Sequence, residues 1–173
     1  MWFNYLLIII LSICVITDIR ERKIYNKVIF PSLILAFLSH LFLDGPISFL
    51  SSLIGFFVGF FILLIPYLLG GMGAGDVKLL ALIGALKGPT FVFHTSIYMA
   101  IVGGLIALIL LLFQNRLHTT LKSFYYYLYS LKNGVKLSSM INKDDLSNTY
   151  PYGTAIAAGA IINLLLEWRF LLC

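Results

Sequence analysis

Six long apolar runs, separated by short stretches that carry most of the charges, constrain the fold of this chain more than any other feature. The runs cover about residues 2–17, 27–43, 48–69, 76–87, 90–113 and 151–172. A charged side chain at the centre of a bilayer costs about 2.5–3.5 kcal/mol or more, so charges gather between membrane-crossing segments. The sequence therefore predicts an all-α, polytopic membrane protein with about six transmembrane helices.

The overall composition agrees with a membrane protein and argues against a nucleic-acid-binding protein. Hydrophobic residues make up 61% of the 173 residues and charged residues 11%, and the mean hydropathy is +1.00. The net charge of +5 comes from basic residues beside apolar runs, which form no continuous basic surface. We expect a single membrane domain over residues 1–173, with membrane lipid and not nucleic acid as its surroundings.

The distribution of basic residues predicts the orientation. With six spans, the loops at 18–27, 70–78 and 114–150 lie on one side of the membrane and hold ten of the twelve Lys and Arg residues. The positive-inside rule places these loops in the cytoplasm and both termini outside. A five-span alternative stays open, because Lys87, Gly88 and Pro89 interrupt a region that would otherwise form one long run. Within residues 114–150, apolar side chains recur at helical spacing, which predicts an interfacial helix on the membrane surface.

Two aspartates lie at the same edge of this predicted bundle. Asp18 ends the first run and Asp76 begins the fourth, so the six-span topology puts both at the cytoplasmic edge. Two close carboxyl groups cannot both ionise readily, so one holds a proton while the other stays charged. Such a pair supplies the general acid and the general base that activate water for peptide hydrolysis. From the dipoles of the helices that carry them, we assign Asp76 as the base and Asp18 as the acid.

A glycine-rich loop, Gly70 to Gly75, delivers Asp76 to the start of its helix. Glycines at membrane depth permit close backbone approach, and irregular backbone is tolerated there only inside protein or beside a wet cavity. Gly73 and Gly75 are therefore candidate supporting residues. The spacing does not fit a dinucleotide-binding loop, because G-x-G-x-x-G would require glycine at position 76.

These residues carry a family resemblance. The segment 73–76, Gly-Ala-Gly-Asp, matches the GxGD signature of type IV prepilin peptidases, and the segment 18–26, with Asp18, Arg20 and Asn26, resembles the first catalytic segment of that family. The segment 150–153, Tyr-Pro-Tyr-Gly, resembles the Pro-x-Gly that opens its last span. The resemblance implies that Asp18 and Asp76 are catalytic, with Arg20 and Asn26 in support.

The resemblance also implies a reaction and a partner. Such enzymes remove the short basic leader of pilin-like precursors at the cytoplasmic face of the cell membrane and need no cofactor. The larger members, which also methylate the new N-terminus, commonly carry paired CxxC motifs that are absent here. The chain is more similar to the short, peptidase-only members that serve Tad or Flp pili, and we expect no methyltransferase activity.

Other interpretations of the same residues remain open. Asp18 is also typical of a stop at the end of a span, Asp76 of a helix N-cap, and Lys78 of an interfacial anchor. The enzyme alternative is a presenilin-type GxGD protease that cuts within other spans. The non-enzyme alternative is a small transporter or secretion-assembly protein that uses buried acids. A zinc protease is not supported, because the three histidines are dispersed and no HExxH is present.

Overall fold

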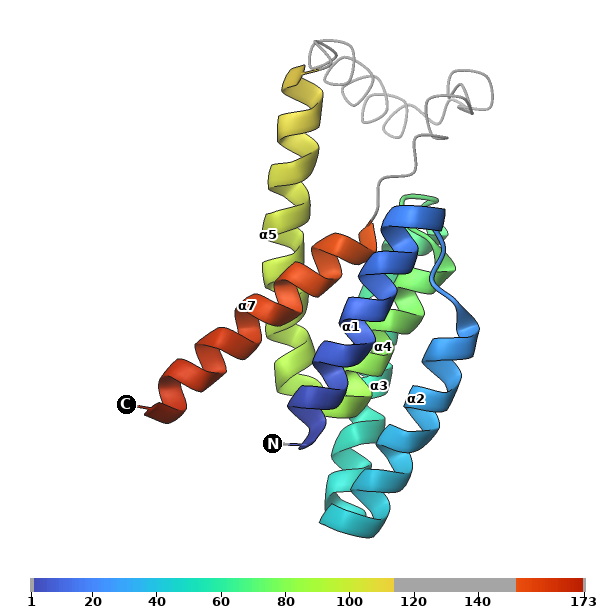
Figure 1. Ribbon diagram of the computed structural model, residues 1–173, viewed down its shortest axis with the longest axis vertical. Helices are drawn as coiled ribbons and strands as arrows, with labels where there is room; N and C mark the ends of the chain where they lie inside the picture. Colours follow the sequence, from blue (N-terminus) through green and yellow to red (C-terminus); the bar gives the residue numbers. More distant parts are fainter. Residues whose placement is uncertain (1, 114–151, 173) are drawn as a thin grey trace, which may run out of the picture. The chain divides into compact units, whose positions relative to one another are not determined.

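The computed structural model describes residues 2–113 and 152–172 of the chain (Figure 1). Two compact units are distinguished, one of Met1–Gly103 with Pro151–Cys173 and one of Gly104–Tyr150. The first unit contains every contact discussed below, and of the second unit only the end of one helix is described. The predicted interfacial segment 114–150 lies outside the described residues, as does Pro151 of the Pro-x-Gly segment.

The described residues form helices and no strands, which confirms the all-α prediction. The helices are α1 (Trp2–Glu21), α2 (Asn26–Ser39) with a π-helical turn (His40–Asp44), α3 (Pro46–Leu68), α4 (Ala74–Lys87), α5 (Pro89–Phe113) and α7 (Tyr152–Leu172). Four stretches are long and apolar enough to cross a membrane, namely Trp2–Glu21, Asn26–Asp44, Pro46–Leu68 and Pro89–Ile109. The chain is therefore a polytopic membrane protein.

A Gly-Pro dipeptide separates consecutive helices at two places in the chain. At Gly45-Pro46 and at Gly88-Pro89 the glycine adopts a positive φ, of 87° and 86°, and the proline opens the next helix. A glycine reaches this backbone region without a Cβ clash, and a proline fits the first turn of a helix because its missing N–H has no partner there. The break at Gly88 divides α4 from α5, as the six-helix interpretation predicts.

Helix α4 is the centre of the first unit. Its residues from Leu79 to Leu86 are all buried, because α1, α2, α3 and α7 all pack against it. A helix that is apolar on every side suits such a position. The backbones of α3 and α4 touch where two glycines meet: a Cβ on Gly84 would lie 2.0 Å from the carbonyl oxygen of Gly55. Small residues at a helix–helix contact permit this close approach in membrane proteins.

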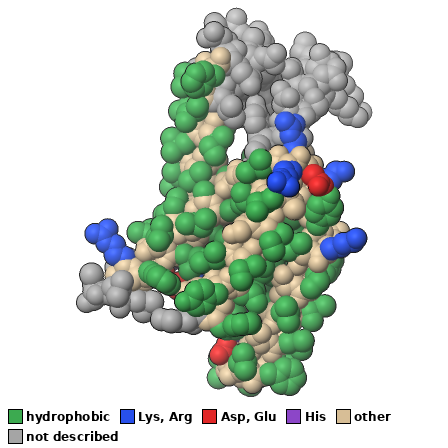
Figure 2. Space-filling model, in the orientation of Figure 1, with side chains coloured by type: hydrophobic (Ala, Val, Ile, Leu, Met, Phe, Trp, Pro, Cys, Tyr) green, Lys and Arg blue, Asp and Glu red, His purple; other side chains and the backbone are tan. Residues whose placement is uncertain are grey.

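The surface of the first unit is apolar. Figure 2 shows hydrophobic side chains over most of the visible face, while charged side chains form a few separate groups. Large side chains such as Phe61 and Ile65 of α3 are more than half exposed. Hydrocarbon accepts such a surface, whereas water does not, so the exposed side chains fit a lipid-facing role.

Candidate active site

Asp18 lies on the buried face of α1. The buried residues of this helix recur at intervals of three and four, at Leu7, Ile10, Leu11, Cys14 and Asp18, so they form one stripe along the helix. The apolar run ends at residue 17 and had suggested that Asp18 follows the helix. The helix in fact continues to Glu21, so Asp18 lies within its last turns. Helical periodicity therefore turns Asp18 inward, and the residue is only 6% exposed.

Asp76 lies in the first turn of α4. The helix begins at Ala74, and the carboxylate oxygen Oδ2 of Asp76 accepts a hydrogen bond of 3.0 Å from the backbone N–H of Gly73. Asp76 is the third residue of the helix, and Gly73 is the N-cap residue. The Asp76 side chain therefore accepts from one of the backbone N–H groups that have no partner within the helix. The side chain is 7% exposed, so this capping carboxylate is also buried.

The two aspartates come from helices that pack together. α1 and α4 are in contact, and the carboxyl group of Asp18 lies within electrostatic range of the carboxyl group of Asp76. Both occupy the end of the bundle where α1 ends and α4 begins (Figure 1). The helix packing thus puts two acids that lie far apart in the sequence at the same end of the bundle.

The N-terminus of α7 supplies a contact that the sequence interpretation missed. The backbone N–H groups of Gly153 and Thr154 act as hydrogen-bond donors to the Asp18 carboxyl group. A Cβ on Gly153 would lie 2.7 Å from the Asp18 oxygen Oδ2, which is closer than real Cβ atoms approach other atoms. Glycine is therefore the residue that lets α7 begin directly against this carboxyl group. The Pro-x-Gly resemblance was the available signal, but only as the start of a span.

This contact removes the reason for the assignment of acid and base. The assignment rested on two helix dipoles: the C-terminus of α1 disfavours a charge on Asp18, and the N-terminus of α4 favours one on Asp76. The N-terminus of α7 carries a partial positive charge that favours an anion at the same carboxyl group. Both aspartates thus receive backbone N–H donors, and helix dipoles do not distinguish their roles.

One atom of the pair has free hydrogen-bonding capacity. The Asp18 oxygen Oδ2 is buried and has no hydrogen-bond partner among the described residues. An unpaired buried carboxylate oxygen costs free energy, and such atoms in native proteins are commonly met by water or a ligand. The atom is well suited to accept a hydrogen bond from a water molecule or a substrate group.

The loop after α1 packs on the first turns of α4. A Cβ on Gly75 would lie 2.9 Å from Cβ of Ile24, so the glycine makes room for the loop. Next to this contact, Nζ of Lys78 donates a hydrogen bond of 2.9 Å to Oδ1 of Asn26, at the start of α2. Lys78 had been interpreted only as an interfacial anchor, but it joins the two segments that carry the aspartates.

The four supporting residues have different surroundings. Gly73 donates to Asp76, Gly75 accommodates Ile24, and Asn26 accepts from Lys78. Arg20 is exposed and lies two positions after Asp18, on another side of α1, so the structure does not bring it to the buried pair. Within the described part of the chain, no group of three His, Cys, Asp or Glu residues is arranged to hold a metal ion.

Comparison with known proteins gives one match. A sequence model described as the type IV leader peptidase family matches residues 5–112, a range that includes both aspartates and the Lys78–Asn26 contact. No curated protein and no solved structure matches the chain.

Proposed function

This chain belongs to the type IV leader peptidase family, and on that premise we propose that it is an aspartyl endopeptidase that removes the short basic leader from pilin-like precursors. The family match supports a peptidase and implies substrates of the pilin type. Asp18 and Asp76 are the proposed catalytic residues. The chain acts without a cofactor in this proposal, and its partner is the precursor protein.

The observation that carries the proposal is the burial of two acids from different helices within electrostatic range of each other. Neither acid is paired with a basic side chain in the hydrogen bonds and ion pairs of the described residues. A buried carboxyl group without a basic partner is costly, so membrane proteins tend to keep such groups for function. The unpartnered Oδ2 of Asp18 adds a site where water can be held.

The reaction follows from one proton shared by the pair. The ionised carboxylate takes a proton from a water molecule, and the water oxygen forms a bond to the carbonyl carbon of the scissile peptide. The protonated carboxyl group donates its proton to the carbonyl oxygen. Collapse of the tetrahedral intermediate breaks the C–N bond, and the leaving amine takes up a proton. The products are a leader with a new carboxyl group and a mature protein with a new N-terminus.

The proposed location is the cytoplasmic face of the cell membrane. Arg20, Arg22, Lys23 and Lys27 are exposed and surround the end of α1, close in sequence to Asp18. The positive-inside rule favours the cytoplasm for this end, and both termini then lie outside. A site on the cytoplasmic side can reach a leader that is still on that side of the membrane, as leader removal requires.

Co-expression with a pilin-like precursor tests the function. We expect wild-type protein to shorten the precursor, and Asp18→Asn and Asp76→Asn to leave it at full length. The matched control is Glu21→Gln, which changes an exposed acid one turn from Asp18. Immunoblots of the membrane fraction establish equal amounts of each variant. Shortening by both Asn variants would instead support the alternative in which the buried acids serve transport or assembly.

A further inference from the structure

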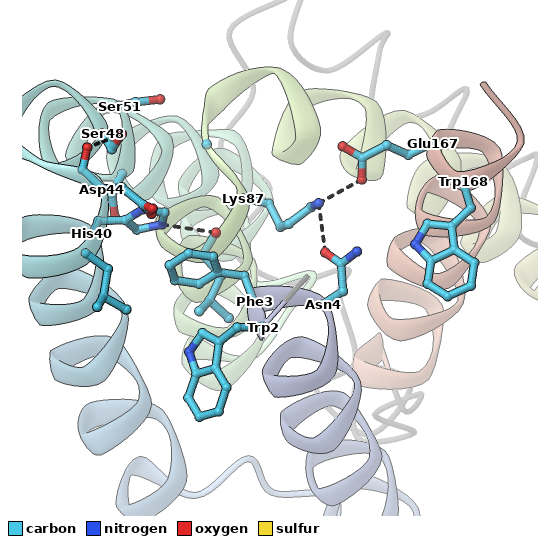
Figure 3. A pocket seen from close by; sticks show the side chains of 14 residues that line it. Trp2, Phe3, Asn4, His40, Asp44, Ser48, Ser51, Lys87, Glu167 and Trp168 are labelled. Atoms are coloured by element: carbon cyan, nitrogen blue, oxygen red, sulfur yellow. Dashed lines mark hydrogen bonds and ion pairs between the residues drawn. The ribbon is translucent and has the colours of Figure 1, made fainter. Parts of the chain in front are cut away.

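A second polar site lies at the opposite end of the bundle from Asp18 and Asp76. A cavity of about 570 Å³ opens between the start of α1, the end of α2, the start of α3, the end of α4 and the last turns of α7 (Figure 3). Small-molecule sites commonly occupy about 300–1,000 Å³. Neither proposed catalytic aspartate lines this cavity, so its chemistry is separate from the candidate active site.

Lys87 is the central cation of this cavity. Its Nζ donates hydrogen bonds to Oδ1 of Asn4 at 3.0 Å and to Oε2 of Glu167 at 2.7 Å, as Figure 3 shows. Nζ also lies 4.9 Å from the centre of the Phe91 ring. An ammonium group has three N–H donors, and these two hydrogen bonds use two of them. The third makes no hydrogen bond to the described residues, so it can bind a ligand oxygen.

His40 and Asp44 form a second polar pair in the cavity. The ring nitrogen Nδ1 of His40 lies 3.1 Å from Oδ2 of Asp44, and Nε2 lies 3.2 Å from the carbonyl oxygen of Leu86. Both partners are hydrogen-bond acceptors, so a ring nitrogen that carries a proton donates to whichever of them it faces. The ring stacks on Phe3, with 4.2 Å between ring centres. The cavity lining thus places a lysine and a histidine beside two carboxyl groups.

The acidic side chains of the two pairs are more exposed than the basic ones. The side chains of Lys87 and His40 are each 13% exposed, whereas those of Glu167 and Asp44 are each 42% exposed. A ligand that enters from outside therefore meets carboxylates first and reaches Lys87 and His40 deeper in the cavity. This order favours a zwitterion with an outer amine, and it disfavours a ligand that carries only negative charge.

The rim of the cavity is typical of a membrane interface. Trp2 and Trp168 line it and are each about half exposed or more. Tryptophan gathers at the level of the lipid headgroups, because its ring is apolar and its N–H is polar. The cavity belongs to a protein with an apolar, lipid-facing surface, so lipid is the ligand that reaches this rim most directly.

We propose that this cavity binds the headgroup of phosphatidylethanolamine. The ammonium group donates hydrogen bonds to the carboxylates of Glu167 and Asp44, and a phosphate oxygen accepts the third N–H of Lys87. The hydroxyl groups of Ser48 and Ser51, which also line the cavity, lie among the polar groups that face the headgroup. The acyl chains continue along the apolar surface of the helices. Phosphatidylcholine has the same net charge but no N–H donors, so it lacks the recognised feature.

Native mass spectrometry of the purified full-length protein tests this site. The delipidated protein is mixed with equal amounts of phosphatidylethanolamine, phosphatidylcholine and phosphatidylglycerol, and the bound lipids are counted. We expect the first lipid to be retained at least about fivefold over each of the others. Equal retention of the three lipids by the wild-type protein would overturn the proposal without any variant.

Two variants locate the binding. Ser51→Leu narrows the cavity and leaves the Lys87–Glu167 and His40–Asp44 contacts in place, and Glu167→Gln removes one anion while it keeps a hydrogen-bonding side chain. We expect both to lower the preference for phosphatidylethanolamine at least about fivefold. The control is Ser12→Leu, which adds the same bulk at an exposed position of α1 outside the cavity and leaves the preference unchanged. A preference that survives Ser51→Leu in a protein of normal thermal stability would contradict binding in this cavity.

Discussion

Lys78 and Asn26 are joined by a hydrogen bond of 2.9 Å, although they lie on different helices. The bond fixes the start of α2 against the second turn of α4, beside the loop that leads from Asp18. We predict that Lys78→Met lowers the rate of precursor cleavage several-fold, because it loosens the position of one aspartate relative to the other. Thermal unfolding should change little, since exposed interactions of this kind are worth about 0–1 kcal/mol.

A double-mutant cycle separates this contact from a general loss of charge. Lys78→Met, Asn26→Ala and the double variant are compared in the same cleavage assay. If the contact acts as proposed, the double variant is no slower than the slower single variant. Lys27→Met, an exposed lysine next to Asn26, is the control and should cleave at the wild-type rate. Fully additive effects would show that the two residues act independently.

Gly75→Ala should impair cleavage because its new Cβ would collide with Ile24 at 2.9 Å. The collision would push the loop after α1 away from α4, and displacements of about 1 Å can cost about 100-fold in rate. Ile24→Gly removes the Cβ that is struck and should restore part of the lost rate in the double variant. Gly71→Ala is the matched control in the same loop, since within the described part of the chain its Cβ would meet only the carbonyl oxygen of Pro66, at 3.4 Å. An unimpaired Gly75→Ala enzyme would argue against close packing of the two segments.

Gly153→Ala should reduce kcat with little change in stability. The added Cβ would lie 2.7 Å from Oδ2 of Asp18, the oxygen that has no described partner, so it would displace the carboxyl group or fill the space for water. We expect a loss of about 100-fold or more. Gly103→Ala is the control, because among the described residues its Cβ would make only an ordinary contact, 3.7 Å from Cβ of Ala155. Wild-type turnover by Gly153→Ala would show that Asp18 is not held as described.

Gly84→Ala should destabilise the fold itself. Its Cβ would lie 2.0 Å from the carbonyl oxygen of Gly55, so α3 and α4 would have to separate. Overpacking of this kind commonly costs about 1–3 kcal/mol. Thermal unfolding in detergent measures the change, and Gly103→Ala, with its nearest contact at 3.7 Å, is the control. Equal unfolding temperatures for the two variants would contradict the backbone contact between α3 and α4.

The helices could be predicted from the sequence because hydrocarbon leaves few alternatives. An apolar run that crosses a membrane must satisfy its own backbone hydrogen bonds, so each run predicts a helix. The second run, expected at 27–43, corresponds to Asn26–Asp44. Helix α1 extends beyond its run to Glu21 because charged residues can continue a helix once it reaches water. The end of a helix in water therefore cannot be predicted from where an apolar run ends.

The contacts between helices were harder to predict. The inward direction of Asp18 follows from its spacing to Leu11 and Cys14, but which helix meets it depends on how the bundle packs. The N-terminus of α7 approaches from more than a hundred residues away, and no local pattern specifies that approach. The cavity around Lys87 combines residues of several helices in the same way, and the sequence indicated only an isolated lysine in an interruption between runs.

The central claim is that Asp18 and Asp76 together activate water for cleavage of a peptide bond. The most direct test is the rate at which purified protein in detergent cleaves a pilin-like precursor, measured for wild type, Asp18→Asn, Asp76→Asn and Glu21→Gln of matched thermal stability. Catalytic residues that act as a unit commonly cost about 10³-fold or more when one is removed. We predict a loss of that size for either Asn variant and no loss for Glu21→Gln, with mass spectrometry locating the new N-terminus. Cleavage by either Asn variant at close to the wild-type rate would contradict the account.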